Sequence, residues 1–287
     1  MSEFVRLPPE STATGYLLRL SRPRFWFYLA GPVIVGATYG AGSLGELFSP
    51  VAVALFCYFL LPANVFLYGV NDVFDRDVDE ANPKKDEKEV RYVGGRLVPA
   101  LVVATGALAL AFVPVLPRAG VLALGAWVFL SVEYSAPPLR FKTTPLFDSL
   151  SNGLYILPAV IAYTVLAGEA PPLAAIAAGW LWTMGMHTFS AIPDIEPDRA
   201  AGIRTTATYL GESKTYGYCA ACWLAAAAVF LLVHPFFTAL LLAYPVLVFG
   251  IVRAGVPVEE AYWWYPAINT LVGMVMTLAG LWVMLYG

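Results

Sequence analysis

Long apolar stretches constrain this chain more than any other feature of its sequence. Nine of them follow one another along the 287 residues, and each is close to the roughly 20 residues that an α-helix needs to cross a membrane. They cover approximately residues 25–44, 51–71, 97–117, 119–134, 149–167, 172–192, 215–233, 236–252 and 262–286. Within them apolar residues run continuously instead of alternating with polar ones, which excludes a membrane-spanning strand barrel.

We therefore predict an all-α integral membrane protein with nine transmembrane helices. Residues 1–24 form a short cytoplasmic segment, and residues 25–287 form a single membrane domain. The composition agrees, because 59% of residues are hydrophobic and 13% are charged, about half the charged fraction of an average soluble protein. This excludes soluble, disordered, collagen-like and nucleic-acid-binding chains, and the net charge of −3 indicates no particular partner.

The basic residues predict how the chain is oriented in the cell membrane. Sixteen of the 17 Lys and Arg residues fall in the N-terminal segment or in loops that follow even-numbered spans, and Arg118 alone falls on the other side. By the positive-inside rule the N-terminus and these loops are cytoplasmic, and the ninth span ends outside. Two cytoplasmic loops are long, and we expect the chemistry to lie there.

An acidic cluster lies at the cytoplasmic end of the second predicted span. Four oxygen-bearing side chains form it: Asn71, Asp72, Asp75 and Asp79. If the helix continues, the three aspartates share one face, which Asn64 and Tyr68 extend back into the membrane. Carboxylates this close repel one another, and a divalent cation removes the repulsion.

A second acidic cluster lies at the cytoplasmic end of the sixth predicted span. Asp194 and Asp198 are four residues apart and share a face with His187, whereas Glu196 points elsewhere. The two clusters are four spans apart. We infer two related four-helix halves that face each other across a cavity, with the ninth helix added.

Oxygen ligands of this kind suit Mg²⁺, which commonly binds few carboxylates together with substrate phosphates. The implied partner is a diphosphate. A run after the fourth span, Tyr134-Ser135-x-Pro137-Pro138-x-Arg140-x-Lys142, supplies basic groups that can hold it. Arg22 and Arg204 are further candidates for the same role.

Together these three motifs resemble, in order and spacing, the signatures of the UbiA superfamily of intramembrane prenyltransferases. The resemblance covers the whole chain and implies nine helices around a lipid-accessible cavity, a cytoplasmic cap, and two Mg²⁺ ions that bind an allylic diphosphate. It implies metal ligands in both acidic clusters, catalytic roles for Asp75, Asp194 and Asp198, and diphosphate contacts for Arg140 and Lys142. Residues 141–155 and 190–208 look most like the carotenoid branch, the lycopene elongases.

The reaction that we expect begins when an allylic diphosphate, of five carbons, ionises to a carbocation. Aromatic rings can shield this cation, and Tyr68, Tyr155, Trp182 and Phe189 are candidates by position. A carotenoid acceptor dissolved in membrane lipid would attack with its terminal alkene, and the resulting tertiary cation would lose a proton or add water. Its pocket should be apolar and open sideways into lipid.

Two alternatives remain at this point. A prenyltransferase with an aromatic acceptor would use the same diphosphate site and would need polar partners deep in the cavity. The candidates in the predicted spans are Asn64, Asn152, Tyr155, His187 and Asn269. A cation-coupled transporter belongs to a different class, but its ionisable residues should lie near the bilayer midplane. The predicted spans carry almost none there.

Overall fold

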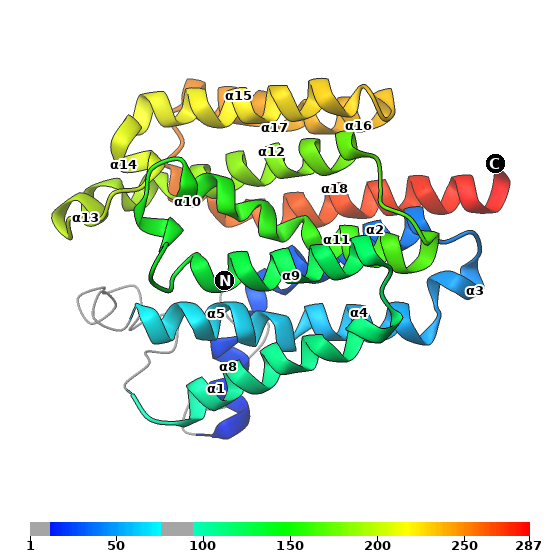
Figure 1. Cartoon of the computed structure of the whole chain (residues 1–287). Helices are drawn as coiled ribbons and strands as arrows, with labels where there is room; N and C mark the ends of the chain where they lie inside the picture. Colours follow the sequence, from blue (N-terminus) through cyan, green and yellow to red (C-terminus); the bar gives the residue numbers. More distant parts are fainter. Residues whose placement is uncertain (1–11, 76–93) are drawn as a thin grey trace.

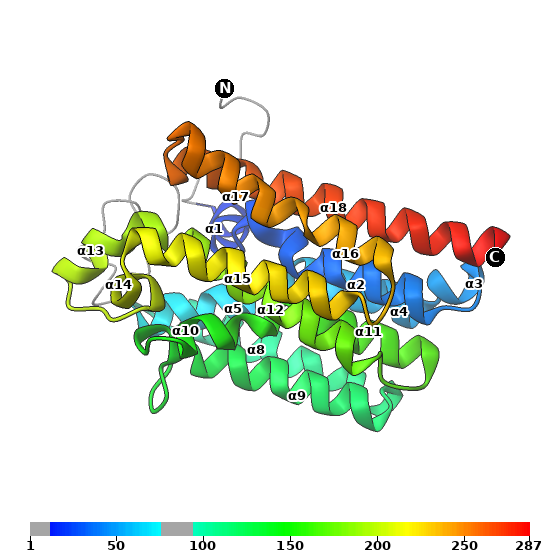
Figure 2. The same cartoon turned by 90° about the horizontal axis from the view of Figure 1, so that it is seen from above.

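The structure is a computed structural model that describes residues 12–75 and 94–287, and all of the regular structure in these residues is helical. The long helices lie side by side in one bundle with roughly parallel axes (Figures 1 and 2). Each of the nine predicted ranges contains helix. The all-α prediction is therefore confirmed for the part of the chain that is described.

The N-terminal half of the bundle contains the elements up to the end of the fifth predicted range. These are α1 (Ala13–Leu20), η1 (Pro23–Phe25), α2 (Trp26–Gly40), α3 (Leu44–Leu47), α4 (Pro50–Leu60), α5 (Pro62–Phe74), α8 (Leu97–Leu108), η2 (Ala109–Val115), α9 (Arg118–Glu133), η3 (Phe141–Thr143), α10 (Phe147–Leu150), η4 (Ser151–Tyr155) and α11 (Leu157–Ala167). The η elements are short 3₁₀ turns.

The C-terminal half contains the remaining elements. These are α12 (Leu173–Ser190), η5 (Ile192–Asp194), α13 (Ile195–Ala200), α14 (Thr206–Leu210), α15 (Glu212–Phe230), α16 (Pro235–Leu241), α17 (Ala243–Ala254) and α18 (Val258–Tyr286).

Five helical segments of the described chain are long and apolar enough to cross a membrane: Pro50–Phe74, Leu97–Val115, Phe147–Ala167, Pro235–Ala254 and Val258–Tyr286. The molecule is thus a multi-pass membrane protein by length and composition. The helices α2 and α9 have 15 and 16 residues, which at about 1.5 Å per residue is shorter than a hydrocarbon core of roughly 30 Å. Many large apolar side chains are exposed on the outside of the bundle, for example Val103, Leu110, Phe249 and Trp282, as lipid contact requires.

Prolines decide where several predicted spans are interrupted. The second predicted span is not one continuous helix, because it divides into α4 and α5 at Leu61–Pro62. Proline has no N–H to donate and its ring clashes with the preceding turn, so the helical hydrogen bonding cannot run through it undisturbed. The sixth predicted span likewise ends as a regular helix at Ser190, three residues before Pro193.

Two glycines allow α2 to approach α11 closely. A Cβ atom on Gly36 would overlap the backbone of Ala159, and one on Gly40 would lie 2.7 Å from the carbonyl oxygen of Tyr163. Small residues four apart bring helix backbones together in membranes, where van der Waals packing replaces the hydrophobic effect as the driving force. This contact joins the first predicted span to the fifth.

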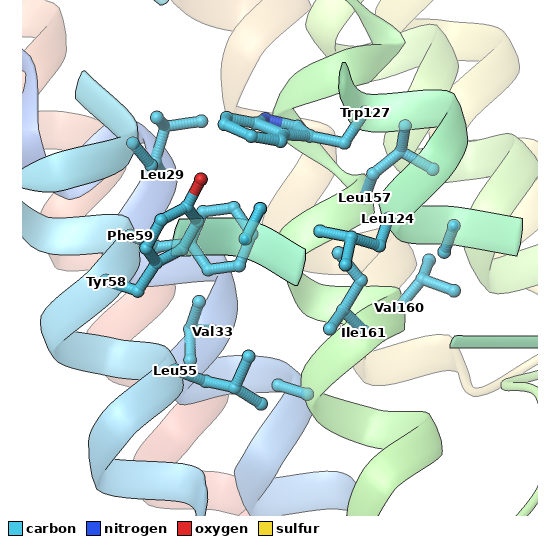
Figure 3. Close-up of a cluster of buried hydrophobic side chains, with 14 of the residues drawn as sticks. Leu29, Val33, Leu55, Tyr58, Phe59, Leu124, Trp127, Leu157, Val160 and Ile161 are labelled. Carbon is cyan, nitrogen blue, oxygen red and sulfur yellow. The ribbon is translucent and has the colours of Figure 1, made fainter. Parts of the chain in front are cut away.

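The buried apolar side chains form two main clusters. The first joins α2, α4, α5, α9 and α11, with Trp127 packed edge-on against Phe59 at 5.2 Å between ring centroids (Figure 3). The second contains side chains of α12, α15, α16, α17 and α18, and it surrounds Trp223 and Tyr265. The cavity described below lies where the two clusters meet, since its lining comes from both.

Candidate active site

The first acidic cluster lies where α5 ends. The helix stops at Phe74, so Asp75 is its C-cap and not part of a longer helical face. Asp72 and Asp75 are only 2% and 4% exposed. A carboxylate that deep is stable only when it is paired or neutralised. Asp79 lies outside the described residues, and its predicted role stays a prediction.

Three cations meet these two carboxylates. The Arg22 Nη2 atom lies 3.2 Å from Asp72 Oδ1, and the Arg140 Nη2 atom lies 3.3 Å from Asp75 Oδ1. Lys142 also forms an ion pair with Asp75. Three basic residues that the sequence assigned to diphosphate binding therefore converge on the first acidic cluster from segments 50 to 70 residues away in the chain.

The backbones of Arg22 and Arg140 share an unusual conformation. Their φ angles are +50° and +42°, in the left-handed region that non-glycine residues rarely enter, and each residue directly precedes a 3₁₀ turn, η1 or η3. Such strain amounts to about 1–3 kcal/mol and is concentrated at functional sites. Arg22 precedes the first predicted span and Arg140 precedes the fifth.

The second acidic cluster lies beyond the end of α12. The break at Pro193 produces η5, which ends at Asp194, and α13 then carries Asp198. Both side chains line a pocket of about 220 Å³ together with Asp75 and Lys142. Glu196 is exposed and pairs instead with Arg199 at 2.8 Å, as the sequence predicts for a residue on the other side of the helix.

A larger cavity of about 700 Å³ continues from this pocket into the bundle. Four residues line both spaces and so join them: Tyr134, His187, Ser190 and Asp194. The Tyr134 hydroxyl lies 3.4 Å from His187 Nε2, with the two rings edge to face. The lining of the large cavity is mainly apolar and includes α2 and α18 from opposite ends of the chain.

Most of the sequence-predicted substrate residues line one of these two spaces or contact a residue that does. Those in the large cavity are Arg22, Tyr68, Asn71, Tyr134, Asn152, Tyr155 and His187. The Arg22 guanidinium lies over the Tyr68 ring at 4.5 Å, a cation–π contact. Ser135 is buried behind the site and accepts a hydrogen bond of 3.1 Å from Asn71 Nδ2, which leaves the amide oxygen of Asn71 for another ligand.

Two predicted substrate residues lie elsewhere. The Asn64 side chain is fully buried outside both pockets, and its amide donates to the carbonyl oxygens of Phe59 and Leu60 at 2.9 and 3.0 Å. It stabilises the proline break between α4 and α5 and does not face the cavity. Arg204 is exposed, and only its neighbours Ile203 and Thr205 line the smaller pocket.

The sequence reasoning missed Asp148, a fully buried carboxylate at the start of the fifth predicted span. Asp148 accepts hydrogen bonds from the Thr206 backbone N–H at 2.9 Å and from the Thr206 hydroxyl. The Thr206 hydroxyl oxygen in turn accepts from the Leu146 N–H at 2.7 Å. This arrangement fixes the loop that carries Lys142 to the loop that follows the second acidic cluster. The feature of the sequence that could have identified Asp148 is an acidic residue at the edge of an apolar span.

Among the described residues no three His, Cys, Asp or Glu side chains gather closely enough to hold a metal ion by themselves. The carboxylates that line the smaller pocket are those of Asp75, Asp194 and Asp198. An anion with several oxygens could complete the coordination of a metal ion that is bound by so few carboxylates.

The fold and the site together are those of a helical membrane protein with an apolar cavity and with acidic and basic groups gathered at one end of it. The chain belongs to the UbiA prenyltransferase family, whose family model matches residues 26–267. It is a prenyltransferase.

Individual relatives point to one branch of that family. The chain is 69% identical to a lycopene elongase/hydratase of Haloarcula japonica, covering 98% of this chain and 96% of the relative, and 66% identical to the lycopene elongase/hydratase of Halobacterium salinarum, covering 95% and 99%. The predicted resemblance to the carotenoid branch is thus confirmed. A solved UbiA homolog from Archaeoglobus fulgidus, bound to DMAPP and Mg²⁺, has the same fold, with a TM-score of 0.68, 22% identity, and coverage of 91% of this chain and 98% of that one.

Proposed function

We propose that this protein transfers a five-carbon prenyl group from dimethylallyl diphosphate to lycopene or a closely related carotenoid, and that the transfer depends on Mg²⁺. The observation that carries the proposal is the pocket shared by Asp75, Asp194, Asp198 and Lys142, which continues into the apolar cavity. Two findings support it. The relatives at 66–69% identity are lycopene elongase/hydratases, and the homolog of the same fold is bound to DMAPP.

The donor set fits magnesium. Carboxylate and amide oxygens are its preferred protein ligands, and the hydrogen bond from Asn71 Nδ2 to Ser135 leaves the Asn71 oxygen available. We propose two ions, one held by Asn71, Asp72, Asp75 and Asp79, the other by Asp194 and Asp198. Bound Mg²⁺ would act as a Lewis acid that offsets the charge of the diphosphate.

The basic residues have a matching role at the departing pyrophosphate. Arg22, Arg140 and Lys142 already surround the first acidic cluster, and their side chains can move from a carboxylate oxygen to a phosphate oxygen over a short distance. Groups fixed where negative charge develops stabilise the transition state, because they need little rearrangement during the reaction. The rings of Tyr68, Tyr134 and Tyr155 line the cavity next to this site and shield the allylic cation from water.

The cavity suits a hydrocarbon acceptor better than a small aromatic acid. Asn152, which the sequence offered as a polar partner, donates its amide to the Asp148 carbonyl oxygen at 2.6 Å, so that donor is engaged. The wall formed by α2 and α18 is largely apolar, with Ile34, Val35, Val272 and Leu278 in the lining. The transporter alternative is weaker, since the described acidic clusters lie at one end of the bundle and not near its middle.

The membrane arrangement is part of the same proposal. Residues 25–287 form one domain of nine spans, with two related four-helix halves and an added ninth helix, and residues 1–24 precede it in the cytoplasm. The loops that carry the acidic and basic clusters are cytoplasmic, and the C-terminus is outside. In support, the C-terminus of α18 lies at the end of the bundle opposite to α13 and α14 (Figures 1 and 2).

Product analysis tests the proposal. Membranes that contain the protein are incubated with C5, C10 or C20 allylic diphosphates and with lycopene or 4-hydroxybenzoate, and products are identified by mass. We expect C5 transfer to lycopene, loss of activity with EDTA, and recovery with Mg²⁺. Transfer to 4-hydroxybenzoate without transfer to lycopene would place the protein in the aromatic class, and activity that persists in EDTA would overturn the magnesium requirement.

A further inference from the structure

A group of polar side chains lies in the wall of the large cavity where α2 and α18 line it. Tyr28 from α2, together with Tyr262 and Asn269 from α18, lines the cavity among mainly apolar neighbours. The proposed transfer step assigns these residues no task.

The Tyr28 hydroxyl is buried and has no hydrogen-bond partner among the described residues. Its ring is fixed by an edge-to-face contact with Tyr155 at 6.1 Å and by Phe25 at 5.3 Å. The Tyr262 hydroxyl and the Asn269 amide are its polar neighbours in the cavity wall, although neither lies in the geometry of a full hydrogen bond with it.

Asn269 is held in one orientation. Its Oδ1 atom accepts a hydrogen bond of 2.8 Å from the hydroxyl of Tyr244, which is fully buried behind it. The N–H groups of the amide are therefore the donors that remain for the cavity. Hydroxyl and amide groups that line one cavity together can hold a water molecule, which needs two to four polar partners.

We infer that Tyr28, Tyr262 and Asn269 bind the water molecule that adds to the tertiary carbocation after prenyl transfer, so that the product is an elongated alcohol. The inference rests on the proposed function and extends it, because it names the residues that decide the fate of the intermediate. Without a bound water the same cation would lose a proton and give an alkene.

The electron pair of the acceptor alkene forms the bond to the allylic carbon, whose bond to the diphosphate oxygen breaks, and the positive charge moves to the adjacent tertiary carbon. A lone pair of the water oxygen then forms a C–O bond to that carbon. The resulting oxonium loses its proton, and the released pyrophosphate is the final base. The overall products are the tertiary alcohol and singly protonated pyrophosphate.

The structure offers a route for this proton. Tyr262 lies close to both Tyr28 and Ser190, and Ser190 lines the large cavity as well as the smaller pocket that contains Asp194. Hydroxyl groups can donate and accept at once, so they can pass a proton from the cavity wall to the diphosphate end.

The test measures the ratio of elongated alcohol to elongated alkene by mass, in membranes supplied with lycopene and dimethylallyl diphosphate in H₂¹⁸O. The wild-type protein should give an ¹⁸O-labelled alcohol. In Tyr28→Phe the ratio should fall about tenfold, equivalent to roughly 1.4 kcal/mol, while the sum of the two elongated products stays within about threefold of wild type. Asn269→Leu should shift the ratio in the same direction, which provides a second variant if Tyr28→Phe does not fold.

Tyr39→Phe is the matched control. Tyr39 is on the same helix, and its hydroxyl donates to the Met276 carbonyl oxygen at 2.9 Å near the other end of α2. Its removal should leave the ratio unchanged. An unchanged ratio in both Tyr28→Phe and Asn269→Leu, or an equal fall in Tyr39→Phe, would overturn the inference.

The inference and the proposed function fail in different ways. If the wild-type protein elongates lycopene but yields only alkene, the water site is wrong and the transferase proposal stands. If it does not elongate a carotenoid, the proposed function itself is wrong.

Discussion

At the scale of single residues, the buried ion pairs at the end of α5 distinguish the first acidic cluster from ordinary surface carboxylates. Asp75 is nearly inaccessible to solvent and is contacted by both Arg140 and Lys142. Removal of one member of such a group leaves the other charges buried and uncompensated. Substitutions that keep the shape of the side chain are therefore the informative ones.

Asp75→Asn and Asp194→Asn should each lower prenyl transfer by at least about a hundredfold, because each would remove a metal-binding charge from a different cluster. Both proteins should still insert into membranes. The assay is product formation per unit of membrane-extracted protein. Glu196→Gln is the control, since Glu196 is exposed and faces Arg199. Turnover close to normal in either aspartate variant would contradict the proposed two-metal site.

Arg140 permits a test that separates its charge from its backbone. Arg140→Ala should weaken donor binding by about 1.5–3 kcal/mol, the range for hydrogen bonds to a charged group, and Arg140→Lys should recover only part of this. Arg140→Gly removes the same side chain without the strain of a left-handed φ of +42°. Donor affinity is measured by titration.

If Arg140→Gly binds the donor as the wild type does, the guanidinium has no role in diphosphate binding. Arg118→Ala, at the opposite end of the bundle, should have no effect on donor affinity.

At the scale of helices, the α2–α11 contact holds together segments that are more than 100 residues apart in the chain. Gly36→Ala should lower the free energy of unfolding by about 1–3 kcal/mol, the usual cost of overpacking, because the added methyl group would meet the Ala159 backbone and not a movable side chain. Gly31→Ala is a control on the same helix, where a Cβ atom has open space. Thermal unfolding in detergent measures both, and equal stability of the two variants would contradict this role for Gly36.

The Asp148–Thr206 pairing should likewise stabilise two loops rather than one helix. Thr206→Val keeps the shape of the side chain but removes a donor from a fully buried carboxylate, which costs about 1–3 kcal/mol. Because the pairing fixes the loop that carries Lys142, donor affinity should fall together with stability. Thr208 in the same short helix caps only its own turn, so Thr208→Val serves as the comparison. Unchanged stability and unchanged donor binding in Thr206→Val would show that this pairing does not position the site.

Local sequence was sufficient for the helices and for the two acidic clusters, since hydropathy and spacing are local properties. It was not sufficient for the helix break at Pro62, whose neighbour Asn64 therefore received a substrate role that its hydrogen bonds do not support. The hydrogen-bond partner of Asp148 and the polar neighbours of Tyr28 could not be predicted either. They come from elements 58 residues away in one case and more than 200 residues away in the other, so only the packed bundle brings them together.

At the scale of the whole molecule, the distribution of charge predicts the direction in which the bundle lies in the membrane. The α11–α12 loop, with the exposed residue Glu169, should be outside, and the loop after the second acidic cluster, with the exposed residue Arg204, should be cytoplasmic. Single cysteines at these two positions, in a background with Cys57 replaced by Ser, report on the two faces. Cys219 and Cys222 are buried and should contribute little labelling.

An impermeant maleimide added to intact cells should label Glu169→Cys at once and Arg204→Cys only after the membrane is permeabilised. The physical reason is that moving loops rich in Lys and Arg across the bilayer is unfavourable. The opposite loops cross readily, because Arg118 is their only basic residue among the described residues. The reverse pattern would place the acidic clusters outside the cell. That result would be incompatible with a donor diphosphate supplied from the cytoplasm, and it would overturn the proposed orientation while leaving the fold unaffected.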